Sequence, residues 1–100
     1  VAIYEEPTRA WELLAAAHAT CFSMALSSGL SKAGTPPTRL TTSAEVDFQP
    51  GTGITGIRLT VSGDVPGVDE MGFRTAAEAA KAGCPVSRAL SAVPISLTIQ

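Results

Sequence analysis

Residues 11–28, with the sequence WELLAAAHATCFSMALSS, form the longest run of helix-favouring residues in the chain. The run is rich in alanine and leucine and contains neither glycine nor proline, so it predicts one continuous helix. At about 100° per residue, the residues that share one face are Leu14, Ala17, His18, Cys21, Met24, Ala25 and Ser28. A helix that is apolar around most of its circumference is typical of a buried central helix. We therefore expect Cys21 to lie in the core.

The same helix is close to the length of about 20 apolar residues that spans a membrane. Glu12 and His18 lie inside the run, however, and Thr20 and the serines that follow it make the run less apolar. Charged residues are costly within a bilayer, so we expect the helix of a protein core and no membrane span.

The composition is that of one small acidic domain. Of the 100 residues, 45% are hydrophobic and 16% are charged, which leaves little polar surface for a monomer and favours a partner subunit. The formal charge of −2 provides no basic surface for nucleic acid, and no basic run offers a membrane contact. Two cysteines and a single histidine, without clustered ligands, indicate a cytoplasmic thiol protein rather than a disulfide scaffold or a zinc site.

Beyond residue 38 the hydrophobic period changes from that of a helix to that of a strand. Alternation predicts a half-buried antiparallel strand over 39–48 and a return strand over 57–62. Turn residues occupy 49–53, and Gly56 is a candidate for a bulge. A last alternating strand is expected over 93–99.

Two further helices are expected before the last strand. Asp69 is placed to cap a helix that ends near Ala82, with its buried stripe formed by Phe73, Ala76, Ala77 and Ala80. Pro85 suits the first position of a short helix, so Cys84 lies near its N-cap. Upstream, residues 1–4 resemble the end of a strand, and Thr8 is a candidate N-cap for the central helix. The order helix, two strands, two helices, strand predicts an α+β domain.

The two cysteines are 84 − 21 = 63 residues apart, too far for a CxxC redox motif. Spacing alone leaves both an inert buried pair and a redox pair open. Cys84 at a helix start gains some thiolate stabilisation from the helix dipole. Cys21 lies in mid-helix and needs a nearby cation to be reactive. Arg88, one turn beyond Cys84, is a candidate for that cation if the two cysteines meet.

Two segments closely resemble the cysteine motifs of the OsmC/Ohr family: AAAHATCFSMAL at residues 15–26 and AGCPVSRAL at 82–90. The resemblance covers nearly the whole chain and is closer to the OsmC branch. It implies a central buried helix packed on antiparallel strands, one domain over 1–100 with a short N-terminus, and an intertwined homodimer. It also implies a thiol peroxidase that reduces organic hydroperoxides with an external dithiol, with Cys21 as the peroxidatic and Cys84 as the resolving cysteine. Neither flavin nor metal is implied.

Near its start, the central helix departs from the pattern of the family. Trp11 stands where members carry an active-site acid, and the segment that supplies an arginine in Ohr-type members is essentially absent. Glu12 is therefore a tentative catalytic acid. It lies about 14 Å along the helix from Cys21, so we expect it to act from a second chain whose central helix packs antiparallel.

Other interpretations remain open at this stage. A non-catalytic binding or scaffold protein on the same fold is the alternative function. His18 lies one turn from Cys21, and we favour a core histidine with its hydrogen bonds made over a proton shuttle. For Trp11 we favour a residue that covers the dimer core over one that lines the entrance of an apolar substrate site. Phe22 and Met24 are expected to be packing residues.

Overall fold

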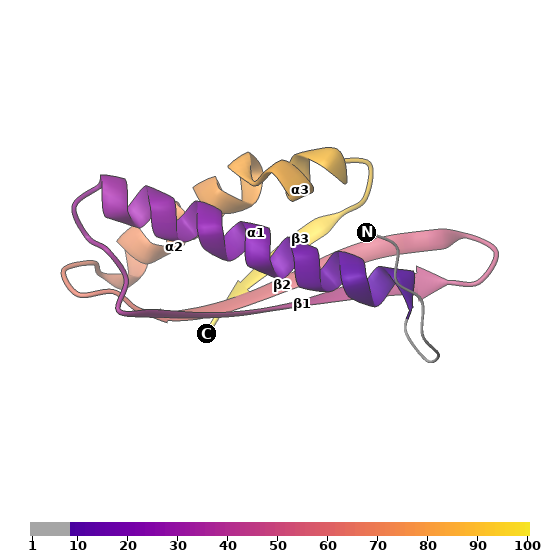
Figure 1. Ribbon diagram of the computed structural model, residues 1–100, viewed down its shortest axis with the longest axis horizontal. Coiled ribbons are helices and arrows are strands. Elements are labelled where there is room, and N and C mark those ends of the chain that lie inside the picture. Colours follow the sequence, from indigo (N-terminus) through magenta and orange to yellow (C-terminus); the bar gives the residue numbers. More distant parts are fainter. Residues whose placement is uncertain (1–8) are drawn as a thin grey trace.

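The structure, a computed structural model, describes residues 9–100 of the chain. The expectations for residues 1–4 and Thr8 lie outside these residues. The described elements follow the predicted order (Figure 1): α1 (Ala10–Lys32), β1 (Arg39–Gln49), β2 (Gly53–Asp64), α2 (Glu70–Gly83), α3 (Pro85–Ala89) and β3 (Ile95–Ile99).

The described strands form one sheet in the order β1-β2-β3. β1 and β2 are an antiparallel hairpin, as predicted, and β3 adds to β2 in the parallel direction. The hairpin register shifts after the pair Asp47↔Gly56, because the next pair is Phe48↔Ile54. Thr55 is thus the extra residue of a bulge beside Gly56, where the sequence predicted one.

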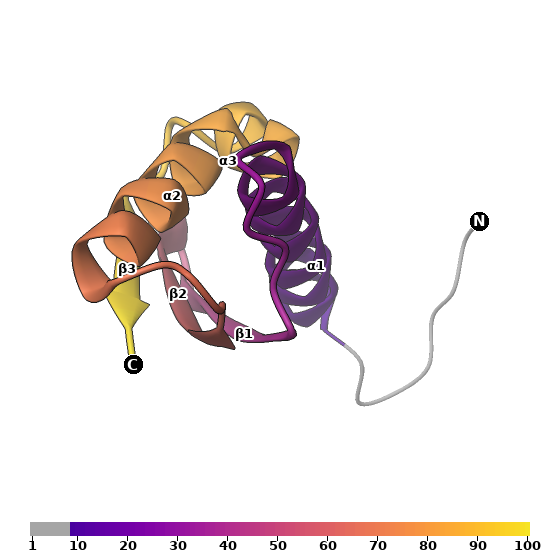
Figure 2. The same ribbon diagram turned by 90° about the vertical axis from the view of Figure 1, so that its left-hand side faces the viewer.

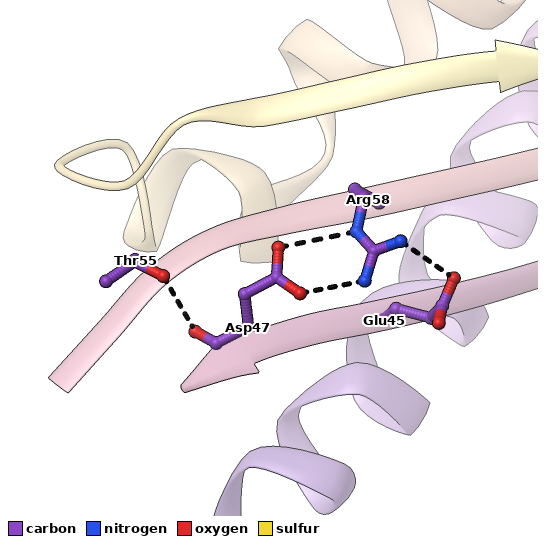
Figure 3. A network of polar contacts seen from close by, with 4 residues as sticks. All are labelled: Glu45, Asp47, Thr55 and Arg58. Carbon is purple, nitrogen blue, oxygen red and sulfur yellow. Dashed lines mark hydrogen bonds and ion pairs between the residues drawn. The ribbon is translucent and has the colours of Figure 1, made fainter. Parts of the chain in front are cut away.

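Helices α1 and α2 lie over the same face of the sheet (Figure 2). On that face β2 buries Ile57, Leu59 and Val61, which are at most 2% exposed. The opposite face of the sheet is polar. There the Arg58 guanidinium contacts Asp47 through Nη2–Oδ1 at 2.8 Å and Nε–Oδ2 at 3.3 Å, and contacts Glu45 at 3.4 Å (Figure 3). Alternation along the strands therefore places the core between helices and sheet.

The buried stripe of α1 differs from the expected face. It consists of His18, Phe22, Leu26 and Leu30, four residues apart in each case. This stripe is centred near Phe22, whereas the expected face was centred on Cys21. Because each residue of a helix is rotated by about 100° from the one before, the buried face is turned by about that angle from the expected one. As a result Met24, expected to pack, is 68% exposed. The prediction for Met24 is wrong for the single chain, whereas that for Phe22 is confirmed.

By length and composition α1 is a candidate membrane span, with a mean hydropathy of 1.4 over its most apolar window. Within the chain, however, its stripe of Phe22, Leu26 and Leu30 belongs to the same buried cluster as Leu59 and Val61 of β2. Only 22% of that window is buried within the chain, so α1 packs on the core along one stripe and leaves the rest of its surface exposed, unlike the buried central helix that was expected.

α2 begins as predicted, because the Asp69 carboxylate accepts a hydrogen bond of 2.7 Å from the Gly72 N–H. Its buried residues are Ala77 and Ala80, and Phe73 and Ala76 pack against the same cluster. α3 follows with Cys84 at its N-cap and Pro85 at its first turn. This short connection places Cys84 directly against α1.

Candidate functional site

A pair of cysteine thiols lies where α1 meets the start of α3. Cys21 comes from the middle of α1 and Cys84 from the N-cap of α3, and both are free thiols. Cys21 packs against the buried cluster that contains Cys84, and each thiol alters the pKa of the other. Cys84 is fully buried and Cys21 is half-buried. A molecule from solvent therefore meets Cys21 first.

The hydrogen bonds around the pair favour a thiolate on Cys84. Burial raises the pKa of Cys84, but the Ser87 N–H, the Cys21 thiol, the Ser87 hydroxyl and the Val86 N–H together hold it below its ordinary value. For Cys21, the Val86 N–H lowers the pKa, but burial and the neighbouring Cys84 outweigh it, so the pKa is raised.

Cys84 and Cys21 differ in the groups that act on their pKa values. Cys84 gains thiolate stabilisation at the helix start, in the direction predicted. Among the described residues, the groups that shift the pKa of Cys21 are Val86 and Cys84 and include no cation. Arg88 is exposed at the surface of α3. The described chain therefore brings the two cysteines together but supplies no activating charge to Cys21.

Trp11 and Glu12 lie in the first turn of α1, away from the thiols at its middle. Glu12 is exposed and lines a groove of about 580 Å³ between α1 and the edge of the sheet, together with Trp11 and Arg58. The Trp11 ring stacks on Phe48 of β1, with centroids 4.2 Å apart and planes inclined by 6°. Nine residues of helix separate Glu12 from Cys21, about 14 Å, so the acid does not reach the thiol of its own chain.

A buried polar pair stands beside the thiols. His18 Nε2 lies 2.7 Å from Ser87 Oγ, and the two residues are 0% and 6% exposed. His18 Nδ1 is buried without a hydrogen-bond partner among the described residues. The histidine is therefore only half satisfied, which differs from the expected core residue. Ser87 was not among the predicted site residues, although it lies three residues after the N-cap Cys84, at a position that a capping side chain faces.

The fold and the thiol pair define the chain as an α+β protein with a two-cysteine site. Residues 6–99 match the family model for OsmC-like proteins. The chain belongs to this OsmC-like family.

Known proteins resemble the chain in sequence and in structure. It is 47% identical over 91 residues to peroxiredoxin OsmC of Escherichia coli, a match that covers 88% of this chain and 64% of that relative. The chain thus spans a little under two thirds of its length. The organic hydroperoxide resistance proteins OsmC of Legionella pneumophila and OhrB of Bacillus subtilis superpose with TM-scores of 0.81 and 0.82. They are 22% and 23% identical, each match covers 96% of this chain, and the covered shares of their own chains are 72% and 73%. These two structures support the predicted fold.

Proposed function

We propose that the chain carries the thiol site of a peroxidase that reduces organic hydroperoxides, with Cys21 as the peroxidatic and Cys84 as the resolving cysteine. The observation that carries this proposal is the contact of two free thiols of which only Cys21 is partly exposed. The relative from E. coli, named a peroxiredoxin, supports the same chemistry.

In the first step the Cys21 thiolate attacks one peroxide oxygen. A sulfur–oxygen bond forms, the oxygen–oxygen bond breaks, and Cys21 becomes a sulfenic acid. The departing alkoxide takes the proton that the Cys21 thiol lost, giving the alcohol. In the second step Cys84 attacks the Cys21 sulfur, and a disulfide and water form. An external dithiol then reduces the disulfide by exchange. This requirement favours a reducing compartment, and we propose the cytoplasm.

Exposure rather than acidity supports Cys21 as the site of the first step. The pKa of Cys84 is the lowered one, but its sulfur is 0% exposed, and a peroxide cannot reach it without opening the core. Cys21 has a raised pKa in the described chain, so its activation calls for a positive charge contributed by groups beyond those described.

A homodimer is the proposed source of the missing groups. The outer face of α1 is exposed and apolar, with Leu13 54% and Met24 68% exposed and the small residues Ala16 and Ala17 between them. Small side chains allow a second helix to approach closely. In an antiparallel arrangement of two such helices, Glu12 of one chain lies near Cys21 of the other.

The raised pKa of Cys21 equally favours the alternative, a binding or scaffold protein that keeps this thiol protonated. Stoichiometric cumene hydroperoxide distinguishes the two functions. In a peroxidase it is consumed within one mixing experiment, and mass spectrometry finds a Cys21–Cys84 disulfide. Cys21→Ser abolishes consumption, whereas Cys84→Ser allows one turnover and leaves a sulfenic acid on Cys21 that dimedone traps. Persistence of both free thiols in the presence of peroxide would establish the scaffold instead.

Mixed dimers test the shared site. Chains with Cys21→Ser are combined with chains carrying Glu12→Ala, each of which is expected to be weakly active or inactive alone. If acid and thiol come from different chains, one of the two sites in the mixed dimer is intact, and activity partly returns. Sedimentation as a monomer at micromolar concentration would contradict both the dimer and the shared site.

A further inference from the structure

The buried His18–Ser87 pair has no part in the two steps described above. It joins α1 to α3 across 69 residues of sequence, through a hydrogen bond of 2.7 Å between Nε2 and Oγ. Both side chains are withdrawn from solvent, at 0% and 6% exposure. Buried polar groups are costly unless they are paired, so the half-satisfied imidazole requires an explanation beyond packing.

The surroundings of His18 assign its hydrogen to Nε2. Burial lowers the pKa of His18, so the ring is neutral near pH 7 and carries one N–H. A hydrogen on Nδ1 would be a buried donor without an acceptor among the described residues. A hydrogen on Nε2 is instead donated to Ser87 Oγ. Because the serine oxygen then accepts, its own hydrogen is left to point elsewhere.

The Cys84 sulfur is the acceptor available to the hydrogen of the Ser87 hydroxyl. Ser87 is the third residue of α3 and Cys84 is the N-cap, the spacing at which an N-cap side chain faces the first turn. The Cys84 side chain makes no capping hydrogen bond by geometry, so its sulfur retains capacity as an acceptor. The Ser87 hydroxyl is nonetheless close enough to help lower the pKa of Cys84.

We propose that His18 and Ser87 are positioning residues for Cys84: the imidazole N–H fixes the serine hydroxyl, whose hydrogen faces the Cys84 sulfur and stabilises its thiolate. This inference rests on the proposed function only for its consequence, the rate of resolution. In that step the Cys84 sulfur forms a bond to the Cys21 sulfur and the sulfur–oxygen bond breaks. Cys84 is oxidised, the sulfenic sulfur is reduced, and the departing hydroxide takes the proton that Cys84 lost, giving water.

The first experiment titrates Cys84 without any peroxide. In a Cys21→Ser background, the ultraviolet absorbance of the thiolate is followed against pH. A hydrogen bond to a charged group corresponds to a shift of about one unit or more, so Ser87→Ala and His18→Leu should each raise the pKa of Cys84 by about one unit. His18→Gln, which keeps an N–H donor, should retain most of the parent value.

Ser23→Ala is the matched control, because Ser23 also makes a side-chain hydrogen bond from α1, to Thr42 Oγ1 at 2.7 Å. This variant should leave the thiol titration unchanged. If all variants titrate like the parent and differ only in thermal stability, the pair merely ties α1 to α3 and the proposal is overturned. Should His18→Leu fail to fold, Ser87→Ala and His18→Gln still decide the outcome.

The second experiment follows resolution in the protein with both cysteines. In Ser87→Ala, a pKa of Cys84 raised by about one unit makes its thiolate fraction about tenfold smaller at a pH below that pKa, while the thiolate itself becomes more nucleophilic. The two effects together should slow disulfide formation by about three- to fourfold. Formation of the Cys21 sulfenic acid should keep its rate. If peroxide fails to oxidise Cys21 at all, the proposed function is refuted, whereas the titration still tests the effect of His18 and Ser87 on Cys84.

Discussion

Oxidation of the thiol pair should stabilise the fold by an amount that follows from its place in the chain. A Cys21–Cys84 disulfide closes a loop of 84 − 21 = 63 residues. In the chain-entropy description, the disulfide lowers the conformational entropy of the unfolded chain and raises its free energy by about 4 kcal/mol. The two thiols already interact in the reduced chain, and Cys84 is held at the cap of α3.

Urea unfolding followed by circular dichroism measures this gain. For a domain of this size the free energy of unfolding falls by roughly 2 kcal/mol per molar urea, so the midpoint of the oxidised protein should rise by about 2 M. Reduced protein and peroxide-treated protein are compared at the same concentration, because a dimer makes the midpoint depend on concentration. Peroxide-treated Cys84→Ser is the control and should show no such rise. Equal midpoints, with the disulfide confirmed by mass, would refute the reasoning.

Three further predictions concern stability. Because burial lowers the pKa of His18, the unfolded state takes up a proton before the folded state does as the pH falls. The free energy of unfolding should therefore decline from about pH 6.5 downwards. In chemical denaturation, His18→Gln should flatten this dependence of the free energy of unfolding on pH between about pH 5 and 7. Phe22→Ala should lower the free energy of unfolding in urea by about 3–5 kcal/mol, because the Phe22 ring is fully buried. Phe48 is 43% exposed and serves as the comparison. If Phe22→Ala and Phe48→Ala have equally small effects, the assignment of Phe22 to the core is contradicted. Asp69→Ala should cost about 1 kcal/mol by loss of the α2 cap, while Asp69→Asn, which still accepts from Gly72, should cost less; equal losses in thermal unfolding would speak against the cap.

Local sequence rules predicted the elements and their order well. The alternation over 39–48 and 57–62, the turn between them and the Asp69 cap are properties of short segments, and these predictions are confirmed. The bulge beside Gly56 was also found from the sequence, since glycine in a strand marks such positions.

Predictions that depend on packing between segments were less complete. The buried face of α1 is turned towards Phe22, whose ring is larger than the Cys21 side chain and lies in one buried cluster with Leu59 and Val61. Hydrophobic periodicity does not take account of side-chain size, so it did not predict this rotation. The parallel direction of β3 depends on how α2 and α3 return the chain to the sheet. For the site, the family motifs pointed to both cysteines, but the His18–Ser87 contact joins residues 69 positions apart and carries no local signal.

The parallel pairing of β2 with β3 affects how the protein is made. Ile57 of β2 pairs with Ile95, and these residues are 95 − 57 = 38 positions apart. The hairpin is complete at Asp64, which is 95 − 64 = 31 positions before β3 begins at Ile95. A ribosome adds roughly 5–20 residues per second, so a nascent chain holds the completed hairpin for roughly 2–6 s before β3 follows. During that interval the β2 edge, with Leu59 and Val61, is an open template for another nascent chain. Slow codons or arrest within residues 65–94 should therefore increase co-translational aggregation, and early chaperone binding should relieve it.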